Sequence, residues 1–90
     1  MKPLIVVDTY NIAASTSPLG MEHQNSWSAF LNAYLASHHP DADLTIIWEV
    51  RGKTQVKAGE GGERDVVLEE LVKQQVRDAW VAWCNSAVEA

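Results

Sequence analysis

The sequence predicts an α/β fold: a small two-layer βαβ-type domain with a sheet of two or three strands and a long C-terminal helix. Apolar, β-branched runs occupy residues 4–7 and 44–50, and a segment with helical apolar spacing lies between them. Two strands joined through a helix form a βαβ unit, in which the strands are parallel and the crossover is right-handed. Ninety residues suffice for one domain and are too few for two, so we expect residues 1–90 to form a single domain.

The first expected strand covers residues 4–7, directly after Pro3. All four positions are apolar, which is typical of a central strand that is covered on both faces. Residues 9–25 are rich in Ser, Thr and Asn and include Pro18 and Gly20, which favour turns. Long loops are uncommon in compact domains unless they are functional or disordered. We therefore expect residues 9–25 to form a flexible loop that can contribute a binding surface.

The first helix is predicted from residue 26 onward. Asn25 or Ser26 can cap its start, and Pro40 ends it because proline disfavours helical geometry in the preceding residue. The apolar positions recur at the spacing that lines one helical face. They are Trp27, Phe30, Leu31, Tyr34 and Leu35.

The second strand is predicted over residues 44–50. Residues 54–58 can pair back through a turn as a short third strand, although Val56 is the only large hydrophobic residue in this segment. Whether this segment is a strand therefore stays open. Residues 59–63 read Gly-Glu-Gly-Gly-Glu, and we interpret them as a flexible break before the second helix.

The second helix is predicted from Arg64 and can extend as far as Ala87. At 1.5 Å per residue it exceeds about 30 Å, which is longer than a small sheet needs for cover. Part of its apolar stripe is therefore expected to face a partner. The stripe comprises Leu68, Leu71, Val72, Val76, Ala79, Trp80 and Trp83.

Charge and cysteine content limit the classes of function that are expected for this protein. The net charge is −5 and the seven basic residues form no run, so direct nucleic-acid binding is not expected. An acidic surface can serve solubility, a metal site or attraction to a basic protein surface. Cys84 is the only cysteine and cannot form an internal disulfide, which favours a cytoplasmic protein. The N-terminal apolar run is too short for a signal peptide or a membrane span.

Asp8 follows the first apolar run, and Asn11 comes three positions later. Mg²⁺ prefers oxygen ligands, and ligand sites in α/β sheets form at the carboxyl ends of strands. Because parallel strands end at the same edge, Glu49 is expected to lie close to Asp8. The favoured alternative is structural: Asp8 begins a turn and Asn11 bonds to the local backbone.

The segment Asp8-Thr9-Tyr10-Asn11 resembles the Asp-Gly-Tyr-Asn signature of NYN domains, relatives of the PIN-type nucleases, with Thr9 in place of the usual glycine. The helix and second strand follow the family's order, Glu49 stands near a family Asp, and Asp65 matches the acidic start of a family helix. The resemblance implies a metal-dependent ribonuclease in which Asp8, Asn11 and Asp65, with Glu49 nearby, bind Mg²⁺ or Mn²⁺. Family members continue with further parallel strands that these ninety residues lack, so a degenerate or binding-only relative is expected.

The favoured hypothesis is a small acidic, non-catalytic interaction protein. It binds a protein partner such as a nucleic-acid-handling enzyme, or a second copy of itself, and requires no cofactor. Its size and charge are similar to those of small acidic phage inhibitors, including anti-CRISPR proteins. For Trp80 and Trp83, core packing is the competing interpretation. The predicted partner-binding residues, on the acidic surface and the second helix, are Glu60, Glu63, Glu69, Glu70, Trp80 and Trp83.

Overall fold

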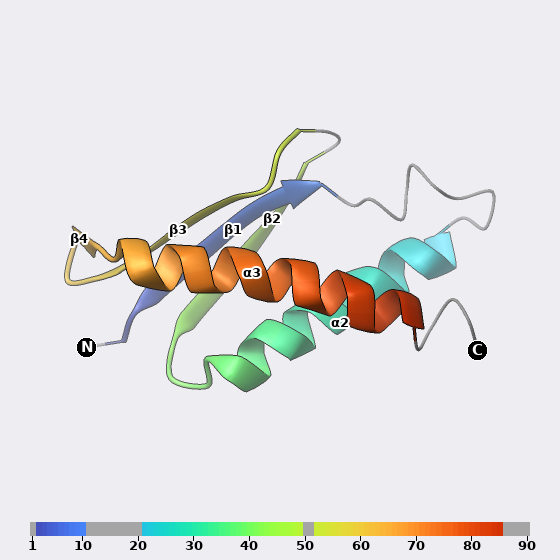
Figure 1. Ribbon diagram of the computed structural model, residues 1–90, viewed down its shortest axis with the longest axis horizontal. Coiled ribbons are helices and arrows are strands. Elements are labelled where there is room, and N and C mark those ends of the chain that lie inside the picture. The colour runs from blue at the N-terminus through green and yellow to red at the C-terminus, as the bar shows by residue number, and fades with distance from the viewer. Residues whose placement is uncertain (1, 11–20, 50–51, 86–90) are drawn as a thin grey trace.

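The computed structural model describes residues 2–10, 21–49 and 52–85 of the chain. Both helices pack on one face of a four-stranded sheet (Figure 1). This confirms the predicted α/β fold with a long C-terminal helix. In chain order the elements are β1 (Leu4–Tyr10), α2 (Met21–His38), β2 (Asp43–Glu49), β3 (Gln55–Glu60), β4 (Glu63–Arg64) and α3 (Val66–Trp83).

The sheet has the strand order β2-β1-β3-β4. β1 and β2 are parallel and are connected through α2, so the predicted βαβ unit is confirmed. β3 pairs with β1 in the antiparallel direction, so the segment that the sequence left open is a strand, and β1 is central. β4 is a two-residue strand that the sequence did not predict.

The glycine-rich segment is a β-hairpin, so the interpretation of residues 59–63 as a flexible break is wrong. Gly61 and Gly62 have φ values of 63° and 84° and connect β3 to β4 in a two-residue turn. Two successive positive φ angles suit the turns that match the twist of a hairpin, and glycine adopts them without steric cost. Gly59 lies within β3, where a Cβ atom would overlap the carbonyl oxygen of Glu63.

The predicted boundaries around α2 also change. α2 begins at Met21, five positions before Ser26, so Asn25 and Ser26 lie inside the helix and do not cap it. Met, Glu and Gln, which precede Asn25, are good helix formers. Since Thr9 belongs to β1, only residues 11–20 of the expected loop are left, and they lie outside the described residues.

The end of α2 is as predicted. The helix stops at His38, two residues before Pro40, and the amide of His39 still donates to the carbonyl of Leu35 at 3.0 Å. His38, in the last turn, and His39, directly after the helix, also have polar contacts. Nδ1 of His38 lies 2.8 Å from the carbonyl oxygen of Tyr34, and Nε2 of His39 lies 2.6 Å from Oε1 of Gln75.

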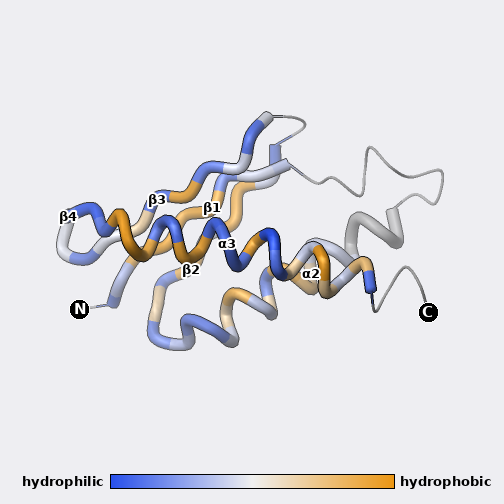
Figure 2. The backbone as a smooth tube through the Cα atoms, viewed as in Figure 1, coloured by the Kyte–Doolittle hydropathy of each residue, from blue (hydrophilic) through white to orange (hydrophobic). Residues whose placement is uncertain are grey.

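α3 spans 18 residues and ends at Trp83. Ala87, to which the helix was expected to extend, lies outside the described residues. The first half of α3 packs over β3 and its second half packs against α2, so α2 covers the end that extends past the sheet (Figure 1). Orange and blue segments alternate along α3, as expected for a helix with one buried face (Figure 2). Leu71 of the predicted stripe is 48% exposed, so the expectation that part of the stripe faces a partner stays a prediction. The buried positions of the stripe are Val72, Val76, Ala79 and Trp83.

Candidate functional site

The side of the sheet opposite the helices is uncovered in the described part of the chain. Along β1, Ile5, Val7 and Thr9 are buried towards the helices, and the alternate residues point to the opposite side. Within the described residues no element covers the second face of β1, contrary to the expectation of cover on both faces. We call this side the uncovered face. It carries Leu4, Val6, Asp8, Tyr10, Asp43, Thr45, Ile47, Glu49, Gln55 and Lys57.

Apolar side chains lie along the uncovered face, from the row of Leu4 at its start to the row of Ile47. Leu4 is 52% exposed and Ile47 is 42% exposed. Val6 is half-buried and lies on β1 between the row of Leu4 and the row in which Asp8 pairs with Ile47. Two neighbouring strands thus present aliphatic surface to the solvent side of the sheet.

Asp8 and Glu49 lie on the same face near the carboxyl ends of two neighbouring parallel strands, as predicted. Asp8 pairs with Ile47, and Tyr10 pairs with Glu49 two residues further along. The two carboxylates are therefore diagonal neighbours on the uncovered face.

Asp65 does not join these carboxylates. It is the N-cap of α3, and its Oδ1 accepts a hydrogen bond from the amide of Leu68 at 3.0 Å. Its own amide donates to the carbonyl of Ala58 at 2.8 Å, and Ala58 pairs with Ile5 near the start of β1. Asp65 thus lies towards the end of the sheet opposite Asp8.

The remaining metal candidate, Asn11, lies outside the described residues. In the part of the chain that the structure covers, no three His, Cys, Asp or Glu side chains gather where they could hold a metal ion. The predicted four-residue ligand set is thus represented there by one pair, Asp8 and Glu49, whose oxygen atoms suit Mg²⁺ or Mn²⁺.

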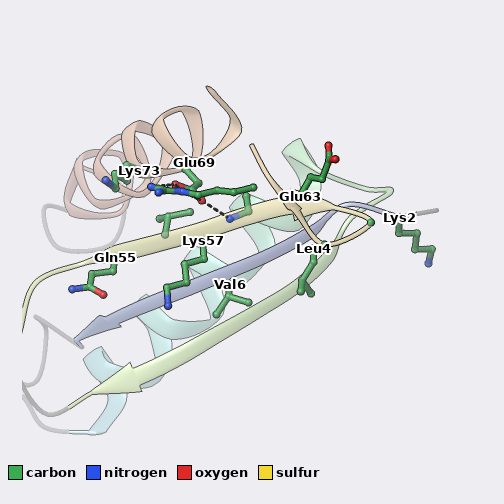
Figure 3. Close-up of a pocket in the computed structure, with 14 residues that line it drawn as sticks. Lys2, Leu4, Val6, Gln55, Lys57, Glu63, Glu69 and Lys73 are labelled. Atoms are coloured by element: carbon green, nitrogen blue, oxygen red, sulfur yellow. Dashed lines mark hydrogen bonds and ion pairs between the residues drawn. The ribbon is translucent and has the colours of Figure 1, made fainter. Parts of the chain in front are cut away.

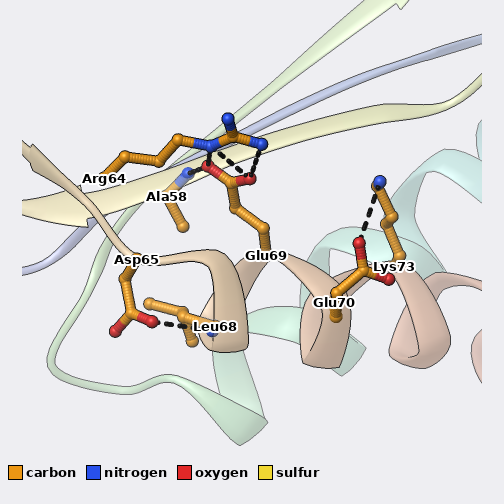
Figure 4. Close-up of polar contacts among 7 residues, drawn as sticks. All are labelled: Ala58, Arg64, Asp65, Leu68, Glu69, Glu70 and Lys73. Carbon is orange, nitrogen blue, oxygen red and sulfur yellow. Dashed lines mark hydrogen bonds and ion pairs between the residues drawn. The ribbon is translucent and has the colours of Figure 1, made fainter.

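Glu69, predicted to contact a partner, is buried at 1% exposure, so this prediction is wrong. Its Oε2 accepts a hydrogen bond from the amide of Ala58 at 3.1 Å (Figure 4). Nε of Arg64 donates to both carboxylate oxygens at 2.8 and 2.9 Å, and Nη2 lies 2.7 Å from Oε1. These contacts tie the first turns of α3 to β3 and β4.

The Arg64 hydrogen bond lowers the pKa of the Glu69 carboxyl below its ordinary value. Burial acts in the opposite direction, and the hydrogen bond from the amide of Ala58 lowers the pKa further. The pKa of Arg64 is raised for the reciprocal reason, since Glu69 accepts its hydrogen bonds. The pair is therefore ionised at neutral pH.

Trp83 is also buried, at 3% exposure, which confirms the core interpretation and excludes direct partner contact by this ring. Its Nε1 donates to Oγ of Ser26 at 3.0 Å. The ring lies 5.8 Å from Trp27, and half-buried Trp80 meets Trp27 edge-on at 5.0 Å. The three rings form a cluster between α2 and α3, in which Nε1 of Trp27 is buried without a partner among the described residues.

The other three predicted partner-binding residues, Glu60, Glu63 and Glu70, are exposed. Glu60 and Glu63 flank the glycine turn between β3 and β4. Glu70 lies on the first half of α3, and its Oε1 accepts from Nζ of Lys73 at 3.3 Å (Figure 4). These residues are accessible to a partner.

A cleft of about 1060 Å³ beside β3 was missed by the sequence analysis. Four of the seven basic residues line it although they are far apart in the sequence, so no local pattern could reveal it. Figure 3 shows Lys57 on one side of the strand and Lys73 on the helix side. We call it the β3-edge cleft. Its basic residues are Lys2, Lys57, Arg64 and Lys73.

No helix within the described residues is both long enough and apolar enough to cross a membrane. Comparison of the chain with protein-family models, with curated proteins and with solved structures finds no match.

Proposed function

We propose that this protein is a non-catalytic interaction protein that binds another protein through the uncovered face. The observation that carries this proposal is the aliphatic surface at Leu4 and Ile47, on the side of the sheet that no described element covers. Exposed apolar patches on small domains commonly mark binding sites, because leaving them in water is unfavourable.

The charge of the uncovered face indicates the charge of the partner's surface. Asp8 and Glu49 lie at one end of the aliphatic surface, and exposed Asp43 pairs with Leu4 at the other. Against these three acids, the described strands place one base, Lys57, on this face. The whole chain carries a charge of −5, which attracts basic surfaces over long distances. We propose a basic, nucleic-acid-handling enzyme of the cytoplasm as the partner and inhibition of that enzyme as the effect.

Aspartate substitutions on the uncovered face test this function. Leu4→Asp and Ile47→Asp should reduce recovery of the bound enzyme from source cells by about tenfold or more, since charge replaces buried apolar contacts. Val67→Asp is the matched control, because Val67 is 81% exposed on α3, away from the sheet. Equal recovery by all three variants, with unchanged circular dichroism, would exclude the uncovered face as the binding surface.

The second candidate is an NYN-like metal-dependent ribonuclease. The observation that favours it is the placement of Asp8 and Glu49 on one face near the ends of parallel strands. It requires Mn²⁺-dependent cleavage of single-stranded RNA that Asp8→Asn eliminates and that Asp43→Asn, at the other end of the face, leaves intact. Pure protein that cleaves no RNA at micromolar concentration would contradict it.

A further inference from the structure

One edge of β3 is only partly paired. β1 pairs with one edge along residues 55–59, whereas β4 pairs with the other edge at Gly59 and Glu60 only. Ala58 has its own partners at this second edge: its amide donates to Glu69 and its carbonyl accepts from the amide of Asp65. The partly paired edge is thus closed from Ala58 onward.

Val56 lies two residues before Ala58 on the same strand. Main-chain groups along an antiparallel strand point alternately to its two edges, so the amide and carbonyl of Val56 point to the edge that Ala58 uses. β4 stops before it reaches Val56. The next position in the sheet, beside Val56, can therefore accept another extended chain.

The β3-edge cleft surrounds this position, with four basic and two acidic side chains in its lining. One acid, Glu69, is neutralised by Arg64, which leaves Lys2, Lys57 and Lys73 against Glu63. The contact of Lys73 with Glu70 is an exposed ion pair at 3.3 Å, a kind that contributes little. The cleft is locally positive on a chain with a net charge of −5.

We infer that the β3-edge cleft binds an extended acidic peptide segment of another protein, which adds to the sheet as a strand beside Val56. Strand addition supplies main-chain hydrogen bonds, and the flanking side chains supply specificity. Successive residues of a strand point to opposite faces. Neighbouring acidic residues of the peptide therefore meet Lys57 on one side of the strand and Lys73 on the other (Figure 3).

Two other occupants fit less well. A second copy could offer the outer edge of β2, but β2 carries acids only at its two ends, and a head-to-tail contact would continue into open chains. A nucleic acid offers phosphates but no main-chain groups to pair with Val56. The cleft shares Leu4 and Val6 with the aliphatic surface of the proposed function, whereas Ile47 does not line it. Ile47→Asp therefore tests the proposed function alone, and Lys73→Glu tests this inference alone.

The test measures the binding of a fluorescein-labelled peptide, Val-Asp-Glu-Val-Asp-Glu, to the full chain by fluorescence anisotropy. Two further peptides carry N-methyl groups on the odd or on the even amides. An added strand directs only one of these two sets at β3, so we expect one methylated peptide to bind about tenfold or more weakly than the other. Equal binding of the two would show attraction by charge alone and overturn strand addition.

Charge variants test the cleft itself. Lys57→Glu and Lys73→Glu should each weaken peptide binding by about threefold to tenfold, as loss of a charge pair and added repulsion predict. Arg77→Glu is the matched control: it makes the same change of charge on α3, but Arg77 does not line the cleft. Equal weakening by Arg77→Glu would overturn the inference.

Three further outcomes would overturn the inference of a peptide site. The first is no saturable binding of the unmodified peptide, and the second is preferential binding of a polyuridylate probe. The third is self-association that Lys57→Glu abolishes while the peptide stays unbound. Since Ile47 does not line the cleft and its variant is scored on recovery of an enzyme, failure of either proposal is recognised separately.

Discussion

The two ends of α3 are held in place by different interactions. At the start, the buried carboxylate of Glu69 binds Arg64 and the amide of Ala58. At the end, Trp83 packs against Trp27 and donates a hydrogen bond to Ser26. The first anchor fixes the helix to the sheet edge through directional bonds, whereas the second fixes it to α2 mainly through apolar area. α3 is therefore held by charged and hydrogen-bonded groups at its start and mainly by apolar packing at its end.

Removal of the aromatic anchor should have the largest effect. We expect Trp83→Ala to lower the free energy of unfolding by about 3–5 kcal/mol, because it leaves a cavity between the helices. Chemical denaturation measures this change. Val81→Ala, at an exposed position of the same helix, should shift the value by no more than about 0.5 kcal/mol. Similar small effects for both would show that Trp83 is not a core residue.

Removal of the polar anchor should have an intermediate effect. Glu69→Ala leaves the buried amide of Ala58 without its acceptor, which costs about 1–3 kcal/mol. Glu70→Ala is the control, since Glu70 is exposed and its contact with Lys73 is a surface ion pair. Hydrogen exchange sharpens the comparison, because faster exchange should be concentrated at Ala58. Equal destabilisation by the two variants would contradict a special role for Glu69.

Acidification should produce the smallest effect and should act on the polar anchor only. Because the folded-state pKa of Glu69 is lowered, its contribution is complete above the ordinary glutamate pKa of about 4.3 and is lost as the pH falls through the folded-state value. Glu69→Gln keeps an acceptor for Ala58 but cannot titrate. We expect the stability difference between wild type and Glu69→Gln to shrink between neutral pH and acid. A constant difference would contradict the lowered pKa.

The sequence predicted the elements whose apolar pattern is local. The parallel strands β1 and β2, the end of α2 at Pro40 and the buried face of α3 all follow from residue spacing. The pairing of β3, with Val56 as its only large hydrophobic residue, depends on its contacts with β1 and stayed open in the sequence.

The candidate sites were harder to predict because they join residues that are distant in the chain. Lys2, Lys57 and Lys73 come together only through the pairing of β1 with β3 and the packing of α3. Glu69 did carry a local signal: it lies three residues before Val72 and so falls on the buried stripe of α3. A charge at such a position indicates a buried partner.

The two anchors of α3 also differ in the length of chain that each one closes. Ala58 and Glu69 are 11 residues apart, whereas Ser26 and Trp83 are 57 residues apart. The entropy cost of loop closure grows with the logarithm of loop length and is about 1.5 kcal/mol larger for the longer loop. We therefore expect β3, β4 and the start of α3 to assemble early in folding, and α2 to join the end of α3 afterwards.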